Sequence, residues 1–336
     1  MTYELTEAER DNGRIDPDKL KQIGNDIRTL GFAVVAGLIS EESRPLLMDS
    51  VLEDAELIRG TGEMTDHEKR TGQGHLQLGL RRRAPYVRQD LLANPAIEAV
   101  VAEILGQGAW LGFYNGNVNL PGSTHQPLHF DRPFSWKTEA QAREAGEDWP
   151  PRATTLSCSV ALQEINLENG ATEIYPGTHR ETAVTEWPLG ERPENHPDLI
   201  ERWAPPARMT IPAGGICFRD PRMWHRGMPN QSDKVRPMIA LTYHAGMCRH
   251  WRGLLVPDMA PEDLHRCQED PTLRVMDDGS LGDGRLVFEE SARSVFEDHP
   301  SQHGIVRYIR FVAEVDHKLD AHLMGGARVL QEAAAG

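Results

Sequence analysis

The spacing of hydrophobic residues changes after Gly106, and this change restricts the fold more than any other feature of the sequence. Up to Gly106, apolar side chains recur at helical spacing. Beyond it lie apolar segments that are typical of strands and are bounded by Pro, Gly, Asn and Asp, at residues 110–120, 155–165, 209–211, 216–219 and 235–243. A mainly helical first third followed by a series of strands predicts an α+β fold with a β-sandwich or barrel core.

Three helices are expected in the first third of the chain. The pair Asp16-Pro17 is typical of a helix start, and Gly31 is typical of a helix end. Residues 32–35 then form a short strand. A second helix is expected from Ser40, and a third after the capping pair Asn94-Pro95.

We expect residues 1–336 to form a single domain. Its parts are a mainly helical region (1–108), a β core (109–245) with insertions at 134–152 and 182–206, and a C-terminal extension (246–336). The extension contains a strand-like piece at 305–312 and a helix pattern after Asp316.

The range 60–83 is rich in Gly, Thr and charge, which predicts a long mobile loop. This loop and the 134–152 insertion, which carries Trp136 and Trp149, are the candidate lids over a site. The run Arg81-Arg82-Arg83 either recognises an anionic substrate or is a solvated basic turn.

Composition excludes several classes of protein. The formal net charge of −15 argues against nucleic acid or an anionic membrane as a partner, because phosphates need a basic surface. Four cysteines without a C-x-x-C pair argue against a zinc ribbon, a thioredoxin site or a disulfide framework. The polar start and the lack of a long apolar run argue against a secretory signal or a membrane span, so a cytoplasmic location is expected.

One pair of residues suggests a metal site. His129 and Asp131 are two apart at the end of a strand-like region, so both side chains point to one face. Alone, such a triplet is more often a surface loop. His225 follows a turn, a strand and a short loop, and supplies a second imidazole. Two histidines and one carboxylate leave three metal positions open, as in non-haem Fe(II) oxygenases.

Arg236 follows His225 and begins an apolar strand. A guanidinium at the start of a core strand needs a partner, because an unpaired buried charge is costly. The partner is either a structural acidic side chain or a carboxylate ligand held by two hydrogen bonds. With His225 just upstream, we favour the ligand.

These pieces, in this order, resemble the phytanoyl-CoA dioxygenase family of Fe(II)- and 2-oxoglutarate-dependent oxygenases, from about residue 30 to about residue 245. The range 31–40 resembles the opening strand and turn of the family, and 91–106 resembles the helix before its barrel. His129-Phe130-Asp131 resembles the H-x-D motif. Residues 168–179 resemble the N-G-x-T…P-G-S-H segment, with Thr178 in place of Ser. His225 and Arg236 resemble the distal histidine and the cosubstrate arginine.

The resemblance implies a double-stranded β-helix, a jelly-roll, cupin-like core with N-terminal helices packed on it and loop insertions over its mouth. It implies that His129, Asp131 and His225 ligate Fe(II), and that Arg236 holds the distal carboxylate of the cosubstrate 2-oxoglutarate. Dioxygen is the other cosubstrate. By similarity, Gln126 and Thr172 hydrogen-bond 2-oxoglutarate.

Related halogenases replace the metal-ligating carboxylate with a small residue, whereas this chain keeps Asp131. The resemblance therefore implies oxidation of a C–H bond of a small-molecule substrate, with succinate and CO2 as products. Hydroxylation is preferred, and desaturation or cyclisation stays open. We expect a substrate of specialised metabolism and either a monomer or a homodimer.

Two other functions stay open at this point. The first is a cupin-type metalloenzyme that does not use 2-oxoglutarate, and the second is a non-catalytic jelly-roll binding protein. Asp220 is an alternative carboxylate ligand, but its place before Pro221 favours a turn. His179 is expected to be structural.

Overall fold

The computed structural model describes residues 1–60, 64–80, 85–132, 138–184 and 193–246, and also 134, 136, 273–275, 281–283, 301–303 and 305. The expected C-terminal strand and helix, and the run of three arginines, lie outside the described residues, apart from Ile305. The described residues include no helix that is both long and apolar enough to cross a membrane.

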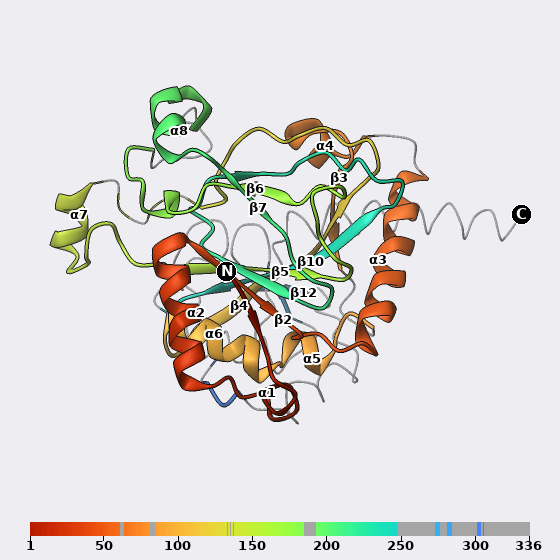
Figure 1. Ribbon diagram of the computed structural model, residues 1–336, viewed down its shortest axis with the longest axis horizontal. Helices are drawn as coiled ribbons and strands as arrows, with labels where there is room; N and C mark the ends of the chain where they lie inside the picture. The colour runs from red at the N-terminus through yellow and green to blue at the C-terminus, as the bar shows by residue number, and fades with distance from the viewer. Residues whose placement is uncertain are drawn as a thin grey trace, which may run out of the picture.

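A large mixed sheet of seven strands lies at the centre of the described fold (Figure 1). Its first two strands are parallel and all other neighbours are antiparallel. The strand order is β1 (Thr2–Glu4), β2 (Phe32–Ala36), β8 (Ile216–Arg219), β5 (Thr155–Ala161), β10 (Arg236–His244), β4 (Trp110–Asn119) and β3 (His75–Gly79).

A small antiparallel sheet completes the core. Its described strands are β7 (Ala207–Met209), β6 (Thr172–Ile174) and β9 (His225–Arg226), in that order, and His129 pairs with His225 to extend it. Along the chain, β4, β5, β8 and β10 belong to the large sheet, and the segment at His129, β6, β7 and β9 belong to the small one. This alternation is the jelly-roll arrangement, so the predicted fold class is confirmed.

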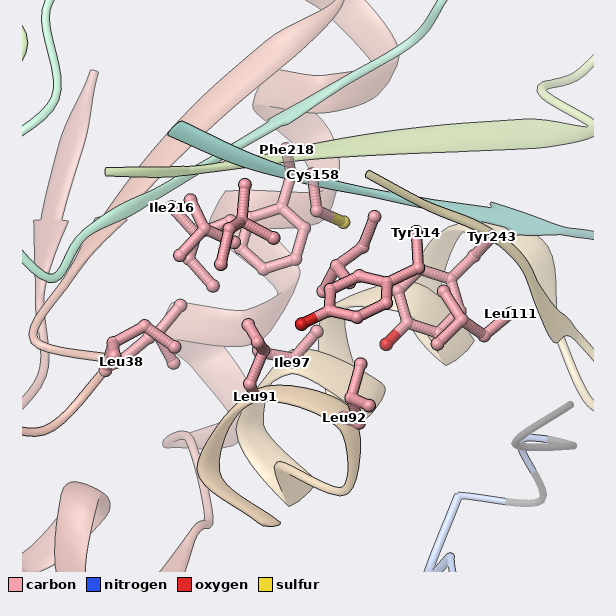
Figure 2. Packing of buried hydrophobic residues seen from close by; sticks show 14 of the residues in the cluster. Leu38, Leu91, Leu92, Ile97, Leu111, Tyr114, Cys158, Ile216, Phe218 and Tyr243 are labelled. Atoms are coloured by element: carbon pink, nitrogen blue, oxygen red, sulfur yellow. The ribbon is translucent and has the colours of Figure 1, made fainter. Parts of the chain in front are cut away.

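Helices cover the outer face of the large sheet (Figure 1). They are α1 (Glu7–Asn12), α2 (Pro17–Leu30), α3 (Ser43–Arg59), α5 (Gln89–Leu92) and α6 (Pro95–Leu105). Of these, α2 contacts α6 and β2, and α6 contacts β5. The main apolar core lies between these helices and the sheet, and Figure 2 shows side chains from both meeting there, among them Leu91, Leu92, Ile97, Tyr114, Cys158, Ile216 and Phe218.

Alternation along the strands places apolar side chains on this outer face. In β5 the fully buried core residues are Leu156, Cys158 and Val160, and in β10 they are Ile239, Leu241 and Tyr243. The residues between them point the other way, into the jelly roll. The same strands therefore build both the core and one wall of a cavity.

The helix expected from Asp16 is confirmed. Asp16 accepts hydrogen bonds from the backbone N–H groups of Asp18 and Lys19, and Gly31 takes the left-handed conformation at the end of α2. The second helix begins at Ser43, slightly later than expected, because Ser40 caps a preceding turn by accepting a hydrogen bond from the Ser43 N–H. The third helix begins at Pro95 as expected.

The expectation of a long loop over residues 60–83 was wrong. It contains α4 (Asp66–Thr71) and the edge strand β3. Thr65 and Glu68 form a capping box that starts α4. In β3, Leu76 and Leu78 alternate with polar residues and pack into the main core, a pattern too short to outweigh the surrounding glycines in the sequence.

Other short elements were also missed. They are β1 and α1 at the start of the chain, α7 (Glu139–Glu144) in the first insertion, and α8 (Pro197–Trp203) in the second. Two 3-10 turns, Thr178–Arg180 and Pro193–Asn195, and an antiparallel pair of strands, β11 (Leu273–Val275) and β12 (Leu281–Asp283), complete the described elements.

The helix end at Gly31 gives a test of the packing between α2 and the core. At Gly31, φ is 89°, and a Cβ atom would lie 2.7 Å from His179 Nδ1 and 3.0 Å from Met223 Sδ. We expect Gly31→Ala to lower the free energy of unfolding by about 3 kcal/mol, from backbone strain and overpacking together.

Gly146→Ala is the matched control, because Gly146 also follows a helix, α7, with a positive φ, of 76°, but a Cβ atom added there would meet nothing within 4 Å. It should cost only about 1 kcal/mol. Urea unfolding of both variants checks the difference, and equal losses would show that crowding at Gly31 is unimportant.

Candidate metal centre and active site

Two distant segments of the chain meet at the candidate metal centre. His129 and His225 exchange backbone hydrogen bonds, with N···O distances of 3.0 Å from His129 to His225 and 2.8 Å in the reverse direction. This antiparallel bridge brings the His129 and His225 rings together, with centroids 4.4 Å apart. The Asp131 N–H donates to the carbonyl of Pro221, which fixes the backbone of the third residue.

The three side chains point to one place. One ligand atom from each of His129, Asp131 and His225 lies within 4.8 Å of the other two. Nε2 of His129 is 3.7 Å from Oδ1 of Asp131, and Nε2 of His225 is 3.4 Å from Oδ2. The structure therefore brings together the three residues that the sequence singled out as metal ligands.

The hydrogen bonds of the two imidazoles suit a metal. Nδ1 of His129 is 2.8 Å from the Pro127 carbonyl, and Nδ1 of His225 is 2.9 Å from the Met223 carbonyl. A carbonyl only accepts, so each Nδ1 carries a proton, and Nε2, the nitrogen that faces Asp131, is the atom available to a metal. Two such nitrogens and a carboxylate are a donor set that a divalent cation fits.

Sequence reasoning missed Arg219, which supports the carboxylate. Its guanidinium donates to Oδ2 of Asp131 at 2.6 Å. It also lies 3.1 Å from Nδ1 of His225, but that nitrogen donates to Met223, so we regard the second approach as a contact and not a hydrogen bond. The signal available in the sequence was an arginine at the end of the apolar strand β8.

The charge state of the site follows from its surroundings. Burial raises the pKa of Asp131, but the nearby His225 and Arg219 outweigh it and hold that pKa well below its usual value. Burial, together with repulsion from His225, lowers the pKa of His129 to about 4, although Asp131 opposes the shift. At neutral pH, Asp131 is therefore an anion and His129 a neutral donor.

The three residues open onto a cavity of about 420 Å³ inside the jelly roll. Residues from the inner faces of both sheets line it. Gln126, Thr172 and Arg236 also lie on its wall, so all six residues predicted for the site share one cavity.

Arg236 is a buried charge on the wall of this cavity. It is 4% exposed, and within the described part of the chain it has no ion pair. Its guanidinium approaches only the carbonyls of Asn169, at 3.5 Å, and Gly170, at 3.3 Å, and the sulfur of Met238. Burial lowers the pKa of Arg236 to about 10, so it remains a cation at neutral pH.

Gln126 and Thr172 present hydrogen-bonding groups to the same cavity. Oε1 of Gln126 accepts from the Gly227 N–H at 2.9 Å, which leaves its amide N–H groups as donors. Thr172 lies on β6, on the opposite wall from β10. Among the described residues, neither the Gln126 amide nitrogen nor the Thr172 hydroxyl has a protein partner.

Asp220 and His179 do not belong to the centre. Asp220 is paired with Arg222 at 2.7 Å, and it also accepts from the Arg222 N–H in a turn. His179 Nε2 is 3.0 Å from the carbonyl of Arg28, where it ties the 3-10 turn to α2. Both placements agree with the structural roles favoured for these residues.

Comparison with known proteins gives a consistent result. A family model described as Phytanoyl-CoA dioxygenase (PhyH) matches residues 15–238. Dioxygenase andF of Emericella variicolor is 27% identical over 160 residues, covering 47% of this chain and 50% of the relative. Ectoine dioxygenase of Bordetella parapertussis is 26% identical over 176 residues, covering 47% and 52%. The chain thus spans about half the length of these two relatives.

Solved structures with similar folds have lower identity. One is the epimerase SnoN in complex with Fe3+, alpha ketoglutarate and nogalamycin RO, with 20% identity and a TM-score of 0.48, covering 68% of this chain and 85% of that chain. Another is HygX from Streptomyces hygroscopicus with nickel, 2-oxoglutarate and hygromycin B bound, with 15% identity and a TM-score of 0.48, covering 73% and 93%.

The low pKa of His129 gives a test in the metal-free protein. In the folded state the pKa of His129 is about 4, below the ordinary 6.5. As the pH falls, the unfolded chain therefore takes up a proton at His129 at a higher pH than the folded chain does. The stabilisation from neutral His129 is complete above about pH 6.5 and is lost as the pH falls towards 4. An NMR titration of the histidine Cε1 protons measures the value.

Asp131→Asn is the matched variant for this titration. The carboxylate raises the pKa of His129, so its removal should lower that pKa further. A His129 pKa at or above the ordinary value in the unsubstituted protein would contradict the geometry described here.

Proposed function

Because the chain belongs to the phytanoyl-CoA dioxygenase family, we propose that it is an Fe(II)- and 2-oxoglutarate-dependent dioxygenase that oxidises a C–H bond of a small molecule. The observation that carries the proposal is Arg236, a buried cation without an acidic partner in the described structure, which shares one cavity with two histidines and a carboxylate. A buried guanidinium is well matched by a carboxylate that accepts two hydrogen bonds.

His129, Asp131 and His225 would hold Fe(II). When bound with 2-oxoglutarate and dioxygen, the ferrous ion supplies the oxidising power for C–H cleavage, and 2-oxoglutarate leaves as succinate and CO2. The carbonyls of Pro127 and Met223 hold the imidazoles in the required tautomer. Such partners beyond the ligands fix ligand orientation and contribute to metal affinity.

Arg219 has two effects on the centre. Its hydrogen bond to Oδ2 orients the Asp131 carboxylate, and its charge keeps that carboxylate ionised. Because Asp131 is retained, the site keeps a full set of three protein ligands. This supports hydroxylation over halogenation as the reaction.

Arg236 would bind the distal carboxylate of 2-oxoglutarate. The amide N–H groups of Gln126 and the hydroxyl of Thr172 would donate further hydrogen bonds to the cosubstrate from the same cavity. The arginine, the amide and the hydroxyl come from different elements, so the folded jelly roll preorganises them around the bound dicarboxylate.

A small-molecule substrate agrees with the cavity volume of about 420 Å³, which must also contain the cosubstrate. The matched ectoine dioxygenase is named after a small molecule. We propose a compound of specialised metabolism as the substrate, and the range 134–152 as part of its cover.

Loss of Arg236 tests the use of 2-oxoglutarate. Arg236→Ala should weaken 2-oxoglutarate binding by about 100-fold, because a charge-assisted, bidentate contact is removed. Calorimetric titration with Zn(II)-loaded protein measures this. Arg180→Ala, an exposed arginine outside the cavity, is the control. Unchanged affinity in Arg236→Ala would favour a cupin-type metalloenzyme that does not use 2-oxoglutarate.

Loss of His129 tests catalysis. The unsubstituted protein should release succinate from 2-oxoglutarate in the presence of Fe(II) and a compound from a substrate library. His129→Ala should lower that release at least about 100-fold through the loss of a metal ligand. An anaerobic absorption titration with Fe(II) and 2-oxoglutarate separates binding from turnover. If the unsubstituted protein neither forms this complex nor releases succinate, the result favours a non-catalytic binding protein.

A further inference from the structure

The inner face of the large sheet carries uncharged polar side chains that the proposed chemistry does not use. Among those that line the cavity are Gln77 of β3, Asn117 of β4, Ser157 and Ser159 of β5, and Thr242 of β10. We call these residues the polar wall. Most sheets with a covered inner face place apolar residues there, so this composition needs an explanation.

The polar wall is open to the cavity, and most of its hydrogen-bonding groups are unpaired in the described structure. In the described structure, the hydroxyls of Ser157, Ser159 and Thr242 and the amide of Gln77 have no hydrogen-bond partner, and none of these atoms is sealed away from solvent. Asn117 accepts from the Asn115 amide at 3.3 Å through Oδ1, which leaves its N–H groups as donors.

The wall extends beyond the reach of the cosubstrate. Thr242 is six residues from Arg236 on the same strand, about 20 Å at the usual rise of a strand. A five-carbon dicarboxylate held at Arg236 is much shorter than this distance. The cosubstrate therefore does not account for the hydroxyls at the far end.

The far end of the wall is also adjacent to the metal centre. Ser157 pairs in register with Thr242 on one side and with Arg219 on the other. Arg219 donates to Asp131, a proposed metal ligand. A molecule bound to the two hydroxyls is thus placed beside the groups where oxidation would occur.

From this arrangement we propose that the polar wall is the substrate subsite, and that the substrate is a hydroxyl-rich ring compound such as a glycoside or a cyclitol. The inference rests on the proposed function and adds the substrate class to it. Each hydrogen bond from the polar wall to such a compound adds affinity. An apolar ligand instead removes water from the wall and leaves each polar group unpaired. The free-energy cost of an unpaired polar group exceeds the gain from one hydrogen bond.

The rest of the lining supports the same class. Among the described residues that line the cavity, only histidines carry an aromatic ring, and two of the three are the proposed metal ligands, so no broad flat apolar surface is available for a fused hydrocarbon ring system. The apolar contributions come from single side chains. Met209 and Pro221 lie outside the large sheet, whereas Met238 and Ala240 lie on β10, on the same face as Thr242. A site with polar groups discriminates strongly against ligands that cannot form hydrogen bonds to them, because those groups are then left unpaired.

The test compares two sets of ring compounds on the protein loaded with Zn(II) and 2-oxoglutarate. Myo-inositol and methyl glucoside represent the proposed class, and camphor and cyclohexyl methyl ether represent rings that donate no hydrogen bond. Ligand-observed NMR titration should give tighter binding for the first set. Tighter binding of the second set, or no binding of either polyol, would overturn the proposal.

The double variant Ser157→Ala/Thr242→Val removes two hydroxyls at nearly constant volume. Polyol affinity should fall about ten-fold, from the loss of two hydrogen bonds. Thr210→Val makes the same chemical change at an exposed position and should leave polyol affinity unchanged. Equal polyol affinity in the double variant and the unsubstituted protein would overturn the subsite.

Calorimetry with 2-oxoglutarate on the same samples separates the two proposals. If the double variant also loses 2-oxoglutarate affinity, the hydroxyls belong to the cosubstrate site and the subsite assignment is wrong. If the unsubstituted protein does not bind 2-oxoglutarate at all, the proposed function fails, while the polyol titration still reports on the wall.

Discussion

The pair of backbone hydrogen bonds between His129 and His225 is the contact on which the site depends. It joins two segments that are far apart in the chain and sets both imidazoles at one edge of the small sheet. The side-chain contacts follow from it, since each ring is then turned by a carbonyl two residues before it, that of Pro127 or of Met223. The metal-binding geometry is therefore a product of strand pairing, and not only of the residue types present.

The large sheet explains how one fold supports both a stable apolar core and a polar cavity. Alternate residues of β5 and β10 pack against the helices as a continuous apolar core. The residues between them, including Ser157, Ser159 and Thr242, face the cavity. Because the two sets lie on opposite faces, changes in the cavity wall alter recognition while the core on the other face is left largely intact. This separation lets a jelly roll carry different substrates on one framework.

Much of this could be predicted from the sequence because the relevant signals are local. The cap at Asp16, the glycine at Gly31 and the change of hydrophobic period after Gly106 identified the fold class. The H-x-D motif, His225 and Arg236 were recognised because their order and types are specific. Arg219 was missed because its partner, Asp131, is distant in sequence, and their contact arises only when β8 lies beside the centre. Strand β3 was missed because two leucines among glycines are a weak signal without the neighbouring β4.

The burial of Arg236 carries a cost that links stability to function. Removing a guanidinium from water without an acidic partner is unfavourable, and the carbonyls of Asn169 and Gly170 compensate only in part at distances of 3.3 to 3.5 Å. A core built for stability alone would place an apolar residue at the start of β10. A dicarboxylate that binds there supplies the missing counter-charge, so it binds the folded chain and not the unfolded one. Binding then stabilises the fold by mass action, and the same unpaired charge that weakens the free protein becomes the source of affinity for its cosubstrate.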